Sequence, residues 1–592
     1  PAAGTLTLNA GVVFKFPVGN YAQIDGTLLT NGTATDAVAF TTYADDSFGG
    51  DSNGDGASGV TGGQWWGLFF NDGADASSLT YATVAGAGYG GTASLELTNA
   101  DISAQYCTLR DGSQSGVDLN GTAAKPRIQR CQIINNGGIA ITGASFDAVP
   151  YVARNLASGN GGDYMLVTQT SVGADAFIGS GAGVNGVVVL NSILSVPVGR
   201  TLTIGPGVTF KFRNVGTYVD VYGTLDTQGS FTSPVVFTTF GDDAFGGDTN
   251  GGGASSVAAG QWWSIFFNAG STGTVEGLLV RGSGYGGTAG VTCNSNGVTL
   301  RQCRVEHGSA GGFKFTAAAA VEHVAVWSTS GNGIELQGGA FDVRHATTHG
   351  GTRGLYRSGA WSGDIVDSIA WAASTANFQG FVAADVRYSD AVGALGGLGN
   401  INVDPLFIDS ATGNLGLQVG SPCIGTGDPL SELDADCSSS DMGAYPRFGA
   451  QAPAAYCVGK TNSVGCTPYI GFSGYASASS TDAFIVRAFD IVAQQNGIFF
   501  YGTSGATSAP FQGGTKCVAS PTLRTPIQNA GGLTGAPTCT GVLSVDFNAW
   551  IQSNVDAALI SGATVNIQAW YRDPGINSTT GLSNALQFGI CN

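Results

Sequence analysis

The stretch RIQRCQIINNGG, residues 127–138, comes after AQYCTLRDGS, residues 104–113, and TYATVAGAG, residues 80–88. Each is a short run of β-favouring residues that ends in Gly, Asn or Asp, which is typical of a strand and its turn. Three such strands fill about 20–25 residues, a period that predicts a parallel β-solenoid whose coils bury their apolar faces on one another. Stacked coils lie about 4.8 Å apart, so Cys107 and Cys131 are expected to be neighbours within disulfide range.

The chain also repeats itself at a much longer offset. GVVFKF (11–16) matches GVTFKF (207–212), and FTTYADDSFGGDSNGDG (40–56) matches FTTFGDDAFGGDTNGGG (237–253). The remaining matches are QWWGLFF (64–70) with QWWSIFF (261–267) and GYGGTA (88–93) with GYGGTA (284–289). The offset is 196 or 197 throughout. A unit of roughly 140 residues has therefore been duplicated with almost no change of length.

The composition excludes several protein classes. Gly accounts for 95 of 592 residues and charged residues for 11%, yet hydrophobic residues reach 43%. The apolar content excludes a disordered chain, and Gly does not recur at every third position as collagen requires. A formal net charge of −18 argues against nucleic acid as a partner. No run of 18 apolar residues is present to span a membrane.

The repeated blocks resemble bacterial right-handed parallel β-helix repeat proteins over about residues 4–447. Residues 402–428 and DMGAY (441–445) resemble the choice-of-anchor Q region that ends many bacterial surface β-helix proteins. Here Cys423 takes the place of a small apolar residue, and its expected partner is Cys437. The resemblance implies a cell-surface or secreted protein and says little about activity, because this fold hosts many functions.

Alternating runs such as TVNIQAWYRD (564–573) predict a C-terminal β-sandwich. With its YCVGKTNSVGC motif (456–466), this part resembles an uncharacterised C-terminal domain of secreted bacterial proteins, which suggests display, secretion or assembly. The expected organisation is a first repeat unit (1–145), connecting coils (146–200), a second repeat unit (201–340), terminal coils with the choice-of-anchor Q-like end (341–447), a linker (448–455) and the β-sandwich (456–592).

The clearest chemical signal is the Asp-rich loop DDSFGGDSNGDG, residues 45–56. Asp51, Asn53 and Asp55 alternate before a Gly, which fits the D-x-[DN]-x-[DN]-G core of calcium loops. Calcium takes six to eight oxygen ligands, and the glutamate of an EF-hand is absent, so Asp45 and Asp46 are expected to supply further carboxylates. The alternative is a solvated Asx/Gly turn without metal.

The second loop repeats this pattern with one ligand fewer. Its candidate calcium ligands are Asp242, Asp243, Asp248 and Asn250, while Gly252 stands where Asp55 stands in the first copy. Calcium is therefore expected to bind more weakly there, unless a main-chain carbonyl substitutes.

Each loop precedes a Gln-Trp-Trp strand, in which one Trp should face the core and the other the exterior. The outer Trp of each pair (Trp65 or Trp66, Trp262 or Trp263) is expected to pack under the long loop; the alternative is stacking on a sugar or a partner. The eleven Cys form no CxxC motif, which favours structural disulfides in an oxidising compartment, and their odd number leaves at least one thiol over.

An enzyme of polysaccharides, a lyase or a hydrolase, is one alternative for function. Its candidate carboxylates all belong to the calcium motif, and Lys15 and Lys211 recur as structural residues of duplicated strands. His345 and His349, four residues apart, are expected on the surface. An active site is usually single, so duplication of the loop predicts a non-enzymatic protein.

Self-assembly is the favoured expectation. The first block begins mid-coil, and the strand GVVVLNSILSVPVGRTLTI (186–204) has almost no counterpart before Leu6. An uncapped solenoid end exposes unpaired backbone, which the β-sandwich of a neighbouring copy could cover in a head-to-tail filament. Residues 1–10 could instead form their own cap. The expected function is that of a secreted structural protein of the bacterial surface or extracellular matrix, with a glycan-binding adhesin as an alternative.

Overall fold

The structure is a computed structural model that describes residues 4–120, 124–391, 396–449, 452–534 and 537–592. The chain is nearly all β, with a parallel β-solenoid of about 16 turns followed by antiparallel sheets at the C-terminus. It divides into two compact units, the first comprising residues up to 319 and 326–339, and the second comprising residues 320–325 and 340–592. This confirms the fold class predicted from the sequence.

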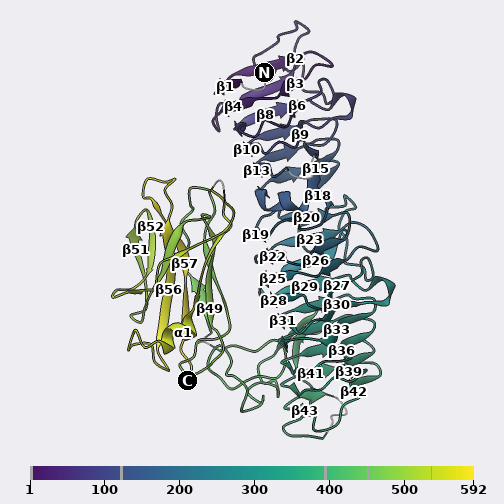
Figure 1. Cartoon of the computed structure of the whole chain (residues 1–592), viewed down its shortest axis with the longest axis vertical. Helices are drawn as coiled ribbons and strands as arrows, with labels where there is room; N and C mark the ends of the chain where they lie inside the picture. The colour runs from purple at the N-terminus through teal and green to yellow at the C-terminus, as the bar shows by residue number, and fades with distance from the viewer. Residues whose placement is uncertain (1–3, 121–123, 392–395, 450–451, 535–536) are drawn as a thin grey trace. The chain divides into compact units, whose positions relative to one another are not determined.

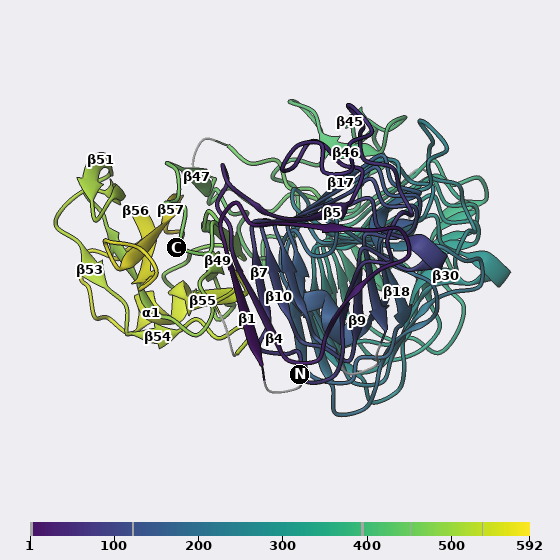
Figure 2. The ribbon, with the colours of Figure 1, turned by 90° about the horizontal axis from the view of Figure 1, so that it is seen from above.

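Each early coil of the first unit gives one strand to each of three parallel sheets (Figures 1 and 2). Sheet I contains β1 (Thr5–Asn9), β4 (Thr27–Asn31), β7 (Ser78–Thr80), β10 (Ser103–Gln105), β13 (Arg127–Gln129) and β16 (Val152–Ala153). Sheet II contains β2 (Val13–Phe16), β5 (Val38–Thr42), β8 (Ala82–Ala85), β11 (Thr108–Arg110), β14 (Gln132–Ile134) and β17 (Leu156–Ser158). Sheet III begins with β3 (Ala22–Ile24), β6 (Leu68–Phe70), β9 (Leu95–Thr98), β12 (Val117–Asn120), β15 (Ile139–Ser145) and β18 (Gly162–Gln169).

Sheet III continues through the later coils of this unit, whereas sheets I and II give way to two others. The later strands of sheet III are β20 (Val187–Leu190), β23 (Thr209–Phe212), β26 (Val235–Thr239), β29 (Leu278–Arg281) and β32 (Arg304–Glu306). Sheet IV contains β19 (Ala176–Ile178), β22 (Thr201–Ile204), β25 (Thr224–Gln228), β28 (Thr272–Glu276) and β31 (Gly297–Arg301). Sheet V contains β21 (Leu194–Val196), β24 (Val219–Val221), β27 (Ile265–Phe267), β30 (Ala289–Asn294), β33 (Gly311–Ala317) and β36 (Asn332–Leu336).

Strand register confirms the short period that the sequence predicts. In sheet II, Thr108 pairs with Thr83 of the preceding coil and with Gln132 of the next. The alternation of buried and exposed residues in strands such as Thr27–Asn31 places one side chain in two inside the coil. Inward-facing Leu79, Val84 and Leu95 are completely buried. Stacking of these apolar layers, coil on coil, stabilises the solenoid.

Not every corner is made by glycine. At the corner between sheets I and II, successive coils place Tyr81, Tyr106, Arg130 and Arg154 in the left-handed region, with φ between 46° and 60°. This conformation costs roughly 1–2 kcal/mol per residue outside glycine. Stacking along the corner offsets part of that cost, since the rings of Tyr81 and Tyr106 lie 5.0 Å apart and Arg130 lies over Tyr106.

The two copies of the duplicated unit occupy different faces of the solenoid. β1, β2 and β3 lie in sheets I, II and III, while their counterparts β22, β23 and β24 lie in sheets IV, III and V. Relative to the shared sheet III, the second copy is therefore displaced by one sheet around the coil. The displacement arises between β15 and β20, where the chain forms the 3-10 turn η2 (Phe146–Tyr151) and the register shifts.

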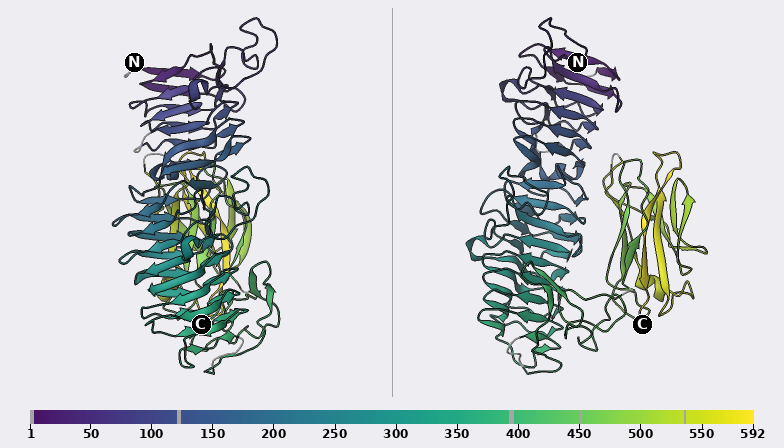
Figure 3. Two further views of the ribbon diagram at one scale, coloured as in Figure 1. Left: turned by 90° about the vertical axis from the view of Figure 1, so that its right-hand side faces the viewer. Right: turned by 180° about the vertical axis from the view of Figure 1, so that it is seen from behind.

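The second unit contains the last coils of the solenoid, shown from two further directions in Figure 3. Their strands are β34 (Ala320–Glu322), β37 (Val343–Arg344), β38 (Thr347–His349), β39 (Arg353–Arg357), β40 (Ile365–Val366), β41 (Ile369–Trp371), β42 (Ala376–Gln379), β43 (Val386–Arg387) and β44 (Asp390–Ala391), and β35 (Ala325–Trp327) crosses the division between the units. The antiparallel pair β45 (Phe407–Asp409) and β46 (Asn414–Leu417) follows. Buried Leu417, Cys423 and Met442 pack on Ile369, so residues after the last coil close its core.

Antiparallel sheets after residue 452 form the C-terminal β-sandwich of the same unit. One sheet contains β47 (Ala454–Tyr456), β57 (Thr580–Gly589), β56 (Thr564–Arg572), β50 (Asn496–Gly502), β53 (Leu523–Arg524) and β54 (Gln528–Asn529). The others contain β48 (Tyr469–Ser473), β49 (Ile485–Ile491) and β55 (Gly541–Asp546), and β51 (Ala506–Phe511) with β52 (Gly514–Val518). Asp546 is the N-cap of helix α1 (Phe547–Gln552), and its side chain accepts hydrogen bonds from the Asn548 and Ala549 amides.

The cysteines pair differently from the expectation. Disulfides join Cys437 to Cys591, Cys457 to Cys517 and Cys466 to Cys539. The expected Cys423–Cys437 bridge is wrong, because Cys423 lies in the apolar core under the last coil while Cys437 reaches the C-terminal end of the β-sandwich. Cys107 and Cys131 lie one above the other as predicted from their spacing, and both are buried free thiols, as are Cys293 and Cys303.

Candidate metal centre

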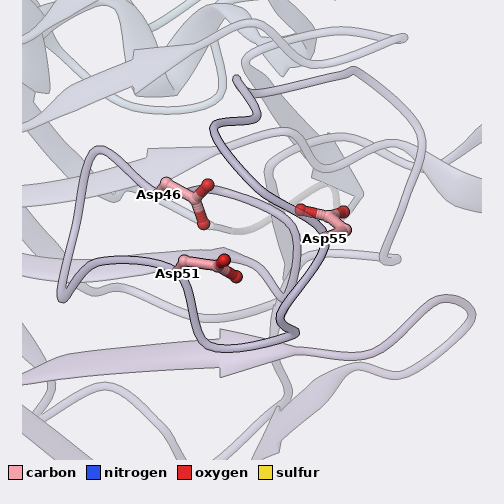
Figure 4. Close-up of side chains that lie close together, drawn as sticks. All are labelled: Asp46, Asp51 and Asp55. Atoms are coloured by element: carbon pink, nitrogen blue, oxygen red, sulfur yellow. The ribbon is translucent and has the colours of Figure 1, made fainter.

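The first Asp-rich loop leaves the solenoid between β5 in sheet II and β6 in sheet III. It brings together Asp46, Asp51 and Asp55, which each offer an oxygen within 4.8 Å of the others (Figure 4). The alternation of polar residues and glycines in the sequence therefore folds into a turn whose carboxylates converge. Gly54 and Gly56 make the turn possible because both adopt positive φ, at 74° and 88°.

Backbone amides hold this arrangement in place. Asp51 accepts hydrogen bonds from the amides of Gly54 (2.6 Å) and Gly56 (3.2 Å), which lower the pKa of its carboxyl group. Asp46 Oδ2 accepts from the amide of Ser58 at 2.8 Å. The other oxygen, Asp46 Oδ1, is buried and has no hydrogen-bond partner among the described residues. A buried carboxylate oxygen without a partner is costly unless a cation or water reaches it.

Asn53 completes the set of oxygen-bearing side chains. Its amide Nδ2 donates to Asp55 Oδ2 at 2.7 Å, so Asn53 and Asp55 are placed side by side. Ser58 Oγ lies 3.3 Å from Asp55 Oδ1. The converging carboxylates of Asp46, Asp51 and Asp55 are hard oxygen donors of the kind that calcium takes, and Asn53 and Ser58 stand next to them. Negative charges this close together favour a cation, because each carboxylate otherwise repels the other two.

Asp45, also expected as a ligand, has a different role. It is completely buried and lies at the root of the loop, where Thr41 Oγ1 donates to its Oδ2 at 2.5 Å. The amide and hydroxyl of Ser47 donate to its Oδ1 at 2.9 and 2.5 Å. The structure therefore does not bring Asp45 into the group formed by Asp46, Asp51 and Asp55.

The second loop, between β26 and β27, reproduces most of this scaffold. Asp243 Oδ2 accepts from the amide and hydroxyl of Ser255 (2.6 and 3.0 Å), and Asp243 Oδ1 is buried without a hydrogen-bond partner among the described residues. Asp248 accepts from the amides of Gly251 and Gly253, and Asn250 from that of Gly252. Within the described residues, only the first loop brings three acidic side chains this close together.

Asp242 corresponds to Asp45 and is likewise completely buried. Thr238 Oγ1 donates to it at 2.6 Å, and Arg281 forms an ion pair with it at 2.7 Å. Arg281 was not predicted from the sequence, and neither were Ser58 and Ser255 as partners of Asp46 and Asp243. The two serines could have been found from the sequence, because they recur at the offset of 197.

In each copy, a lysine on the strand of the preceding coil donates hydrogen bonds to the loop. Lys15 Nζ donates to the carbonyl of Gly50 at 2.5 Å, and Lys211 Nζ donates to the carbonyl of Gly247 at 2.7 Å and to Thr249 Oγ1 at 2.8 Å. Lys211 is completely buried, and this burial lowers its pKa to about 8 although Asp242, Asp243 and Asp248 favour its charge. These bonds give both lysines a structural role, as the sequence predicts.

The Trp pairs point as expected from strand alternation. Trp65 and Trp262 are completely buried and stack on Phe16 and Phe212, with ring centroids 4.3 and 4.4 Å apart. Trp66 is half-buried on the outer face.

The expectation of surface histidines is wrong for His345. Its side chain is 12% exposed and stacks on His323, with centroids 4.4 Å apart, and its Nδ1 lies 3.1 Å from the carbonyl oxygen of Asp441, so residues after the last coil cover it.

No protein-family model matches the sequence, and no curated protein matches it either. Among the described residues, no helix has both the length and the apolar character needed to cross a membrane.

Proposed function

We propose that this protein is a non-enzymatic structural component of an extracellular surface or matrix, and that calcium at its first Asp-rich loop stabilises it. The observation that carries the proposal is the group of Asp46, Asp51 and Asp55, whose oxygens converge within 4.8 Å, together with Asp46 Oδ1, which is buried and has no hydrogen-bond partner in the described part of the chain. Three disulfides fit an oxidising extracellular compartment.

The Asp and Lys residues that could take part in catalysis make hydrogen bonds within the loops instead, which favours a structural role. The buried Asp45 and Asp242 secure the roots of the two loops, and Lys15 and Lys211 donate to loop carbonyls. In the polysaccharide lyase or hydrolase alternative, these groups would have to be free to act on a substrate. That alternative predicts release of reducing ends or unsaturated products from acidic polysaccharides, and such release would contradict the proposal.

Calcium binding is tested by isothermal titration calorimetry on the full chain after chelator treatment. We expect one site, which Asp55→Asn weakens by about tenfold or more because a hard carboxylate ligand is lost. Asp248→Asn in the second loop is the matched control and is expected to leave the titration unchanged. Equal weakening by both variants, or absence of heat with the wild type, would contradict the proposed site.

We also propose that the first coil mediates head-to-tail assembly. Among the described residues, β1, β2 and β3 are the outermost strands of sheets I, II and III, and Leu6 on this coil is 53% exposed. Strand edges and apolar side chains of this kind accept a further strand from a neighbour, and we assign that neighbour to a second copy.

Light scattering and electron microscopy of concentrated protein with calcium test this assembly. Filaments that Leu6→Lys abolishes are expected, since a charge on the edge blocks pairing. Protein that stays monomeric at high concentration would refute head-to-tail assembly and leave the calcium proposal standing. By its resemblance, the choice-of-anchor Q-like end (402–445) is proposed to serve surface attachment, and the β-sandwich to serve display or assembly.

A further inference from the structure

An outward-facing aromatic cluster accompanies the loop in the first copy. Trp66 lies beside Tyr89 with ring centroids 5.7 Å apart, and Tyr21 meets the edge of Phe69 at 5.6 Å. The backbone of Trp66 lies beside the residue that precedes Tyr21, because the Trp66 amide donates to the carbonyl of Asn20. Tyr89 remains 41% exposed and Tyr21 56% exposed. These tilted and edge-on arrangements leave ring surface open to solvent, unlike a buried stack.

The second copy repeats the cluster with the corresponding residues. Trp263 lies 6.2 Å from Tyr285 and 6.1 Å from Tyr218, and Tyr218 meets the edge of Phe266 at 5.6 Å. Tyr285 is 44% exposed. The first cluster lies on sheet III and the second on sheet V, so the two clusters occupy different faces of the solenoid.

The same backbone contacts hold the exposed tyrosine in both copies. It stands in a 3-10 turn, η1 (Tyr89–Gly91) or η3 (Tyr285–Gly287), whose tyrosine amide donates to the carbonyl of the buried Trp (3.0 Å in each copy). Thr92 Oγ1 donates to the Trp66 carbonyl, and Ser113 Oγ to that of Gly88. A Cβ at Gly90 would approach Trp66 to 2.7 Å, and both Gly90 and its counterpart Gly286 adopt positive φ, at 67° and 68°, which favours glycine. The rings are therefore positioned before any ligand binds.

Hydrogen-bonding groups lie on the same outer face. Gln23 and Asn71 both donate to Asp25, at 2.9 and 2.7 Å, and Gln23 pairs in register with Phe69. In the second copy, Asn268 donates to Asp220, which pairs with Phe266. Open aromatic surface beside fixed amide and carboxylate groups matches a sugar ring, which has apolar C–H faces and hydroxyl edges.

We propose that each cluster binds a neutral polysaccharide chain, so that the protein carries two carbohydrate-binding patches on different faces. Charge selects this occupant, because Asp25, Asp220 and the net charge of −18 repel an acidic polymer. The proposal goes beyond the structural role argued above, since it names the partner that the solenoid would hold. Two patches on one rigid rod would crosslink two chains or bind one polymer with avidity.

Affinity electrophoresis of the full chain in gels that contain neutral polymers (β-glucan, amylose, galactomannan) tests the proposal, with polygalacturonate as the acidic probe. We expect retardation by at least one neutral polymer and none by polygalacturonate. Tyr89→Ala and Tyr285→Ala are each expected to weaken binding about three- to tenfold, and the double variant to lose more than tenfold beyond either. Tyr89→Phe should bind as the wild type does.

Phe511→Ala, which removes an exposed ring from the β-sandwich, is the matched control and should bind normally. Far-UV circular dichroism checks that each variant is folded. Unchanged retardation of the double variant, retardation by polygalacturonate alone, or a change in oligomeric state with the aromatic variants instead of in binding would each overturn the proposal. Calorimetric calcium binding is unaffected by any of these outcomes, so the two proposals fail independently.

Discussion

Arg281 Nη1 donates to both carboxylate oxygens of the buried Asp242, at 3.0 and 2.7 Å. In the first copy the same task falls to Ser47, whose hydroxyl and amide satisfy Asp45. The second copy has Ala244 where the first has Ser47, and the first copy has Ala85 where the second has Arg281. Each copy therefore contains one of the two partners: serine in the first copy and arginine in the second. The buried aspartate at the root of the loop thus accepts hydrogen bonds from neutral donors in the first copy and forms an ion pair with arginine in the second.

This difference predicts unequal costs of substitution. Arg281→Met leaves the Asp242 carboxylate without its cation, and removing one partner of a buried pair costs about 3–5 kcal/mol. We expect a clear fall in the midpoint of urea unfolding. Arg281 also pairs with Glu306 at 3.3 Å, but Glu306 keeps its ion pair with Arg304 at 3.7 Å. The double variant Arg281→Met, Asp242→Asn should therefore recover much of the loss, because Asp242 no longer leaves a buried charge without a partner. A single variant as stable as the wild type would contradict this reading of the pair.

The missing third carboxylate of the second loop can be restored. Gly252 has no positive φ, and a Cβ there would meet only the flexible side chain of Asn250, at 3.0 Å. We expect Gly252→Asp to create a second calcium site, because Asp243 and Asp248 are already held as Asp46 and Asp51 are. Calorimetry should show two sites in the variant. Gly252→Asn, which adds a neutral side chain of the same size, is the control and should bind calcium less well. A single site in Gly252→Asp would show that more than the third carboxylate separates the two loops.

His345 predicts a dependence of stability on acid pH. Burial lowers its pKa to about 4, and the ionisable groups around it are His323, which stacks on it at 4.4 Å, Asp367, at 3.6 Å, and Arg344. As the pH falls, a His in the unfolded chain binds a proton near pH 6.5, whereas folded His345 binds it only near pH 4. Neutral His345 therefore makes its whole contribution to the free energy of unfolding above about pH 6.5. As the pH falls toward 4, the free energy of unfolding decreases by about 3 kcal/mol.

Several buried carboxyl groups titrate nearby in the opposite sense, including Asp434, whose pKa burial raises to about 8. The measurement is therefore the difference in unfolding free energy between the wild type and His345→Gln at pH 7 and at pH 4.5. We expect the advantage of the wild type to shrink as pH falls. An advantage that grew on acidification would mean that His345 is charged in the folded protein.

The cysteine pattern predicts a specific peptide map. Non-reducing digestion should link the peptides of Cys437 and Cys591, and five cysteines should react with alkylating agents only after denaturation, because all five thiols are buried. Mass spectrometry of peptides alkylated before and after denaturation provides the check. A peptide that links Cys423 to Cys437 would contradict the structure, and one that links Cys107 to Cys131 would show that the stacked thiols oxidise.

The sequence alone determined the coil, the duplication and the loops. The spacing from Cys107 to Cys131 set the length of a coil, because strands must meet in register for their apolar faces to stack. The alternation of Asp51, Asn53 and Asp55 predicted that these side chains lie close together in the first loop, and the oxygens of Asp51 and Asp55 do so. Local patterns of this kind suffice wherever neighbouring residues decide which way a side chain points.

Only the tertiary structure decided what depends on residues far apart in the chain. Asp45 and Asp46 are adjacent, yet Asp45 is buried at the root of the loop, where Thr41 and Ser47 donate hydrogen bonds to it, and Asp46 faces Asp51 and Asp55. The partner of Cys437 lies 154 residues away. The displacement of the second copy by one sheet depends on how the coils between β15 and β20 wind. An offset in sequence counts residues, whereas the face that a strand occupies depends on the turns between them.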